Sequence, residues 1–89
     1  IPAEYGLIDI FPNPFNPVTK IVYGIPKITT FKIIVYDISG RKVLELFDGM
    51  KMQGYHSIDF YAGDLSSGVY FVAMVSDQQI STQRLLLVK

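Results

Sequence analysis

The chain has 89 residues, which is room for a single domain that buries about 60 to 65% of its unfolded surface. Eight basic and eight acidic side chains leave no formal net charge, so the composition does not favour nucleic acid or an anionic membrane as a partner. The absence of cysteine excludes disulfides, thiol catalysis and thiolate metal sites, and no apolar run approaches the ~20 residues that span a bilayer. We expect one domain over residues 1–89, from a fragment or processed product because the chain starts at Ile1 rather than Met.

Apolar residues alternate with polar residues at a period of two through most of the chain. They are mainly Ile, Val, Phe and Tyr, which favour strands over helices. Seven strands are expected, at Leu7–Phe11, Thr19–Ile25, Phe31–Ile38, Lys42–Phe47, Tyr55–Phe60, Val69–Ser76 and Ile80–Val88. Their spacing of about 8 to 14 residues, with turn residues between them, predicts an all-β, seven-stranded antiparallel sandwich of the immunoglobulin or fibronectin type III kind.

The stretch "FPNPFNPVT", residues 11–19, separates the first two expected strands. Its three prolines lack a backbone N–H and hold the preceding residues in an extended conformation, which predicts a stiff corner. We expect Asn13 and Asn16 to accept hydrogen bonds from nearby backbone N–H groups in Asx turns. Phe15 is then an apolar residue on a rigid bend, and we expect it to plug one end of the sandwich.

Two connections have readable turn signals. In "YDISGRKV", Gly40 stands where a hairpin loop needs positive φ, and Asp37 or Ser39 can accept the backbone donors of the turn. Arg41 is expected to pair with Asp37, a surface interaction worth about 0 to 1 kcal/mol. Pro26 is expected to end the second strand, because proline cannot continue a central ladder.

The stretch "DGMKMQGY", residues 48–55, has a glycine near each end. It predicts a flexible connection between the fourth and fifth strands. Met50 and Met52 are expected to lie in this loop, partly buried.

The alternation assigns side chains to faces of the sheets. We expect the core to include Phe31, Ile33 and Val35 on the third strand and Tyr70, Val72 and Met74 on the sixth. The third and sixth strands are neighbours in an immunoglobulin-like order. Their outer faces would then bring together one solvent-facing apolar patch, made of Ile34, Tyr36, Phe71 and Val75.

The sequence offers little catalytic chemistry. His56 is the single histidine, and it shares a face with Ile58 and Phe60, so we expect a strand histidine at the margin of the core. A Ser/Lys pair remains open on composition, but no set of nucleophile, base and orienting group can be built around one histidine without cysteine. We therefore expect neither enzyme activity nor a cofactor.

Two binding functions remain as alternatives. The aspartates are spread singly, without a calcium-loop motif, although two or three of them meeting in space would suit Ca²⁺: Asp9, Asp37, Asp48, Asp59, Asp64 and Asp77. The twelve Phe and Tyr residues would suit a platform for sugar rings, but tryptophan is absent. Tyr5, Tyr55 and Tyr61 lie near turns, where surface tyrosines are ordinary.

Three stretches in order carry a family resemblance: "FPNPFNPVTKIVYGIP", "FKIIVYDISGRKV" and "DLSSGVYFVAMV", followed by the closing "QRLLLVK". They resemble the C-terminal sorting domain of proteins exported by the bacterial type IX (Por) secretion system. They equally resemble the immunoglobulin-like domain of the flagellar hook-capping protein, whose assembly role would require flagellar sequence that this chain does not show. The resemblance covers nearly all 89 residues, and Phe60 stands where family members often have a tryptophan.

Each family motif maps onto positions of this chain. The first falls on Pro12, Asn13, Pro14 and Phe15, the second on Asp37, Gly40 and Arg41, and the third on Leu65, Gly68, Val69 and Tyr70. The third motif also has the pattern of a tyrosine corner, in which the Tyr70 hydroxyl bonds back to a backbone group of the preceding loop. Arg84 and Lys89 match the basic, apolar terminus of the family.

The resemblance implies a non-catalytic targeting module at the C-terminus of a larger secreted bacterial protein. Its implied partners are outer-membrane components of the secretion system, a sortase-like peptidase and the upstream domain of the same chain, and its implied destination is the cell surface, by way of the periplasm and outer membrane. We expect a monomer recognised by shape and exposed backbone, through the final strand with Arg84 and Lys89 and through the apolar patch. The alternative is an accessory structural or carbohydrate-binding sandwich attached to a secreted hydrolase.

Overall fold

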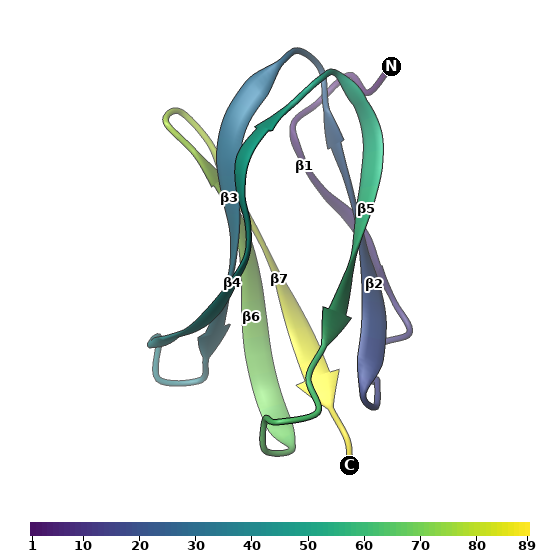
Figure 1. Ribbon diagram of the computed structural model, residues 1–89, viewed down its shortest axis with the longest axis vertical. Helices are drawn as coiled ribbons and strands as arrows, with labels where there is room; N and C mark the ends of the chain where they lie inside the picture. The colour runs from purple at the N-terminus through teal and green to yellow at the C-terminus, as the bar shows by residue number, and fades with distance from the viewer.

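The computed structural model describes all 89 residues, and seven antiparallel strands form two facing sheets (Figure 1). The strands are β1 (Gly6–Phe11), β2 (Val18–Ile25), β3 (Thr29–Asp37), β4 (Lys42–Lys51), β5 (Gly54–Tyr61), β6 (Gly68–Ser76) and β7 (Ile80–Leu87). One sheet has the order β1-β2-β5 and the other β4-β3-β6-β7. The predicted sandwich is confirmed, and the third and sixth strands are neighbours as expected. No helix in the chain is long and apolar enough to cross a membrane.

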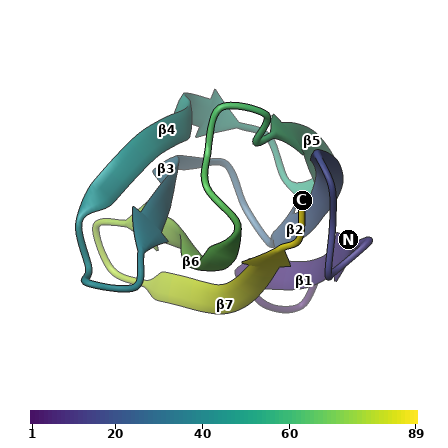
Figure 2. The ribbon, with the colours of Figure 1, turned by 90° about the horizontal axis from the view of Figure 1, so that it is seen from below.

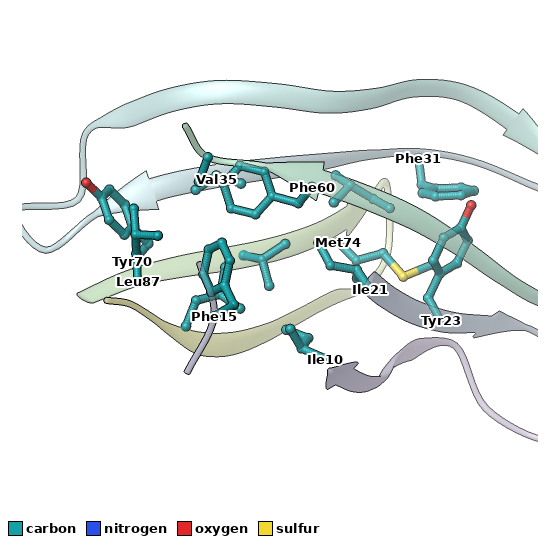
Figure 3. Close-up of a cluster of buried hydrophobic side chains, with 14 of the residues drawn as sticks. Ile10, Phe15, Ile21, Tyr23, Phe31, Val35, Phe60, Tyr70, Met74 and Leu87 are labelled. Carbon is teal, nitrogen blue, oxygen red and sulfur yellow. The ribbon is translucent and has the colours of Figure 1, made fainter. Parts of the chain in front are cut away.

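The core lies between the two sheets (Figure 3). The six inward residues predicted on the third and sixth strands are all buried, and Ile33, Val72 and Met74 are fully enclosed. The inner face of the smaller sheet adds Ile21 and Phe60, which are also fully enclosed. Two-residue alternation therefore assigned the inward faces of these strands correctly.

The two lateral sides of the sandwich differ. Figure 2 shows β1 beside β7 on one side and β4 beside β5 on the other. Contacts join β1 to β7, where the backbone N–H of Leu7 donates to Ser81 Oγ at 3.0 Å. Further along the same side, Phe15 forms a parallel bridge with Leu87. The β1/β7 side is therefore closed by hydrogen bonds between segments far apart in the sequence.

The fourth strand is longer than predicted. It continues to Lys51, and β5 begins at Gly54, so the expected flexible connection over residues 48–55 is wrong except for residues 52 and 53. The glycine read as a turn signal, Gly49, pairs with Phe31 within the sheet, and a Cβ there would lie 3.4 Å from the ring of Phe47. A glycine beside a neighbouring ring indicates close packing in a strand rather than a turn.

The methionines also differ from the prediction. Met50 lies in β4 and Met52 follows it, and both are exposed, by 62% and 71%. The other strands start or end within two residues of the predicted positions, and β2 ends at Ile25, directly before Pro26, as expected.

Candidate functional site

The outer face of the β4-β3-β6-β7 sheet carries the predicted patch. Tyr36 lies opposite Phe71 in the register of β3 and β6, and Ile34 lies opposite Ala73. Val75 lies opposite Lys32, one step further along the same face. The structure thus places all four predicted patch residues on one face of two adjacent strands.

The patch is less exposed than expected. Ile34 is only 9% exposed, so the prediction that it faces solvent is wrong, while Tyr36, Phe71 and Val75 are half-buried. Glu45 lies opposite Ile34 on β4 and forms ion pairs with Lys32, at 3.9 Å, and Lys42, at 3.6 Å. The long stems of such flanking side chains cover apolar surface while their charges stay in water.

Sequence reasoning named Arg84 on β7 but missed the apolar residues that flank it on this face. Ile80 lies opposite Val75 and is 66% exposed, and Leu86 lies opposite Val69 and is also exposed. Arg84 lies opposite Phe71, between them. The two-residue spacing of Ile80, Thr82, Arg84 and Leu86 was the sequence signal that could have placed Ile80 and Leu86 on this face. We call Tyr36, Phe71, Val75, Ile80 and Leu86 the outer apolar patch.

The opening motif lies against the edge of the final strand. Asn13 does not make the local Asx turn that was expected. Its side-chain Nδ2 donates to the carbonyl of Arg84 and its Oδ1 accepts from the N–H of Leu86, both at 3.0 Å. The backbone of Phe15 then donates to the carbonyl of Leu86 and accepts from the N–H of Val88, both also at 3.0 Å. The backbone of β7 that was expected to be exposed is occupied here.

Phe15 enters the core as predicted. Its side chain is 3% exposed, and its ring centroid lies 5.6 Å from that of Phe60 (Figure 3). Nearby, Thr19 Oγ1 donates to the carbonyl of Pro12 at 2.6 Å, which fixes the start of the motif to β2. The motif is therefore anchored by both side-chain burial and hydrogen bonds.

The second motif builds the β3–β4 hairpin around one carboxylate. Asp37 Oδ1 accepts hydrogen bonds from the N–H and hydroxyl of Ser39 and from the N–H of Arg41, and Oδ2 accepts from Arg41 Nε at 3.2 Å. Gly40 has φ of 86°, the positive value that the sequence predicted. The Ser39 hydroxyl and the Arg41 backbone are the main causes that lower the pKa of Asp37 below its usual value. The predicted pairing of Arg41 with Asp37 is confirmed.

The third motif is a tyrosine corner, as predicted. The hydroxyl of Tyr70 donates to the carbonyl of Ser66 at 2.7 Å, while its ring is buried in the core. Leu65 packs against the same core, and Gly68 begins β6. This motif has a structural explanation throughout.

The end of the chain is tied to the loop before β6. The backbone N–H of Lys89 donates to Ser67 Oγ at 3.0 Å, and its Nζ donates to the carbonyl of Gly63 at 2.6 Å. Arg84 is exposed on β7, away from Lys89. The two predicted basic residues therefore do not form one cluster.

The remaining candidates do not converge on a catalytic or metal site. His56 is half-buried, stacks on Tyr23 at 5.5 Å and contacts the carbonyl of Met52 through Nε2 at 2.8 Å, as expected of a histidine at the margin of the core. No group of three or more His, Asp or Glu residues is placed to hold a metal ion.

The tyrosines considered for sugar binding are dispersed. Tyr55 and Tyr61 lie at opposite ends of β5, about 20 Å apart at the usual rise of a strand. Tyr5 is half-buried, and burial raises the pKa of its hydroxyl. It borders a pocket of about 310 Å³ between the β2–β3 and β6–β7 loops, whose lining includes Asp77 but no second carboxylate that could join it in holding Ca²⁺.

Comparison with known families decides between the resemblances. The family model described as secretion system C-terminal sorting domain matches residues 9–89. The chain belongs to this family. No curated protein and no solved structure matches it. The sorting domain is a non-catalytic module for type IX secretion of a larger protein, and it acts by interacting with the secretion machinery.

Family membership separates the motifs by role. In this sorting domain the three motifs lie within the family match, and each has a packing or hydrogen-bonding role in the sandwich. The outer apolar patch has no such role, because its side chains point away from the core. It is therefore the strongest candidate for contact with the secretion machinery.

Proposed function

We propose that the sorting domain carries its protein to the cell surface as a folded sandwich, and that outer-membrane components of the secretion system bind its outer apolar patch. The family match over residues 9–89 is the observation that supports export. A folded signal suits this chain because its first and last segments hold each other: Asn13 and Phe15 bond to residues 84–88.

The composition of the patch favours a protein partner. The patch combines aromatic and aliphatic side chains. Phe71 on β6 lies opposite Tyr36 on β3 and opposite Arg84 on β7. Aromatic residues and arginine are enriched at protein interfaces, where the ring is buried and the guanidinium forms hydrogen bonds. Lys32 on β3, together with Lys42 and Glu45 on β4, provides a charged border to the patch. Arg84 therefore belongs to the proposed binding face, whereas Lys89 ties the end of the chain to the loop before β6.

A second step of the proposal concerns removal of the domain. A sortase-like peptidase would cut in the connection before residue 1, which leaves the sandwich intact. Ile1 is 84% exposed and lies at the end of the molecule opposite the C-terminus (Figure 1). A chain that leaves the sandwich at an exposed residue suits proteolysis better than a strand within a sheet does.

A reporter fusion tests export. A periplasmic reporter would be produced with and without residues 1–89 at its C-terminus, in a bacterium with type IX secretion and in the same strain with the translocon deleted. We expect the fused reporter at the cell surface or in the medium only in the strain with the translocon. A fused reporter that stays in the periplasm of that strain, as the unfused reporter does, would contradict the proposal.

A further inference from the structure

Residues Asn13–Phe15 form an edge strap along the final strand. In an edge strand, every second residue directs its N–H and C=O away from the sheet, where they are open to another chain. On β7 the strap occupies four consecutive groups of this kind: the carbonyl of Arg84, the N–H and carbonyl of Leu86, and the N–H of Val88. The side-chain amide of Asn13 supplies two of the four partners, since it carries a donor and an acceptor like a peptide group.

The strap is held firmly in place. Phe15 is buried against Phe60, and Thr19 bonds to the carbonyl just before the strap. Releasing it would move an aromatic ring from the core into water, which strongly disfavours the released state. The strap is therefore a permanent part of the native structure rather than a mobile lid.

Two of the three other edge strands, β4 and β1, carry bulges, and the third, β5, pairs with β2 without a shift. On β4, the register shifts twice against β3, which places bulges at Val43 and Leu46. On β1, the register shifts once against β2, at Ile8. Bulges disrupt the regular edge that a second strand requires. Like β5, β7 pairs with its neighbour without any shift over its whole length, so no bulge protects its edge.

The outward side chains of β7 give it little protection of their own. Arg84 is the single charge among Ile80, Thr82, Arg84 and Leu86, and charged side chains are a common means of protecting an edge. A regular, apolar edge strand is a template for pairing with another chain.

We propose that the edge strap blocks strand addition to β7, and that the strand it excludes is β7 of a second copy of the domain. The strap fills outward backbone groups of residues 84–88, so a second strand cannot pair along this part of β7 and the domain stays monomeric. A corollary rests on the proposed function: the secretion machinery reads the side chains of the outer apolar patch and not the backbone edge of β7.

Hydrogen exchange and sedimentation on the purified domain test the block without any secretion assay. Asn13→Ala removes two of the four bonds, and Asn16→Ala is the matched control, because Asn16 also precedes a proline, is exposed and makes no side-chain hydrogen bond. In Asn13→Ala we expect exchange of the Leu86 amide to rise about fivefold, as the loss of a hydrogen bond worth roughly 1 kcal/mol implies. We also expect a concentration-dependent dimer that neither the native domain nor Asn16→Ala forms.

A second variant separates the lost bonds from general loosening. In Asn13→Asp the side chain keeps an acceptor for the N–H of Leu86 but loses the donor to the carbonyl of Arg84. We expect its self-association to lie between those of the native domain and Asn13→Ala. Unchanged exchange of the Leu86 amide in Asn13→Ala, or faster exchange there without any dimer, would overturn the proposal that the strap blocks strand addition. Equal self-association of Asn13→Ala and Asn16→Ala would also overturn it.

Discussion

The hydroxyl of Tyr70 and the backbone carbonyl of Ser66 form a hydrogen bond of 2.7 Å that ties the start of β6 to the loop before it. The Tyr70 ring lies in the core at the same end as Phe15 and Leu87 (Figure 3). One side chain thus joins the loop, the core and the strand that carries part of the outer apolar patch.

Tyr70→Phe keeps the ring and removes this bond. We expect the free energy of unfolding to fall by about 1 kcal/mol, because the Ser66 carbonyl loses its partner. Urea unfolding followed by fluorescence or circular dichroism would measure the change. Tyr36→Phe is the control, since the hydroxyl of Tyr36 makes no hydrogen bond on the outer face. Equal losses in the two variants would contradict a special role of the corner.

Phe15→Ala should be severe. Deletion of a buried Phe side chain costs about 3 to 5 kcal/mol, which is a large part of the 5 to 15 kcal/mol that stabilises a typical domain. Phe11→Ala, four residues earlier and 69% exposed, should change stability by less than about 0.5 kcal/mol. Thermal or urea unfolding of both variants checks the difference. A mild effect of Phe15→Ala would show that Phe15 does not plug the core.

Asp37 predicts a dependence of stability on pH. Its pKa is lower in the folded domain than in the unfolded chain. At pH values near these two pKa values, the folded state therefore binds fewer protons than the unfolded state. The stabilisation is complete above the unfolded pKa of about 4 and is lost as the pH falls through the lower, folded value. The stability advantage of the native domain over Asp37→Asn should therefore shrink below about pH 4, measured by urea midpoints from pH 6 to pH 2. A constant difference across that range would contradict the prediction.

Local patterns were sufficient to predict much of the fold. Period-two alternation placed Ile33 and Val72 inside, because a strand side chain has only two faces to choose from. The hairpin at Asp37 and the corner at Tyr70 were also predictable, since each is made by residues within four positions of one another.

Long-range features were not predictable in this way. Asn13 was assigned a local turn because nearby N–H groups are the default partners of an asparagine, yet its partners are 71 and 73 residues away. Ile34 was assigned to solvent because alternation gives the face of a side chain and not how far its neighbours cover it, and Ile34 lies between Glu45 on β4 and Ala73 on β6. Such pairings depend on the order of strands in the sheet.

The most direct test of the proposed binding face is export of the reporter fusion with single substitutions on opposite outer faces. Phe71→Gln removes the central ring of the outer apolar patch, and Val22→Gln is its control, because Val22 is also half-buried on the outer side of a central strand, in the other sheet. Melting temperatures of both domains would establish that each is folded at the assay temperature. We expect Phe71→Gln to leave most of the reporter in the periplasm, while Val22→Gln is exported like the native fusion. Equal export of the two variants would contradict recognition through this face.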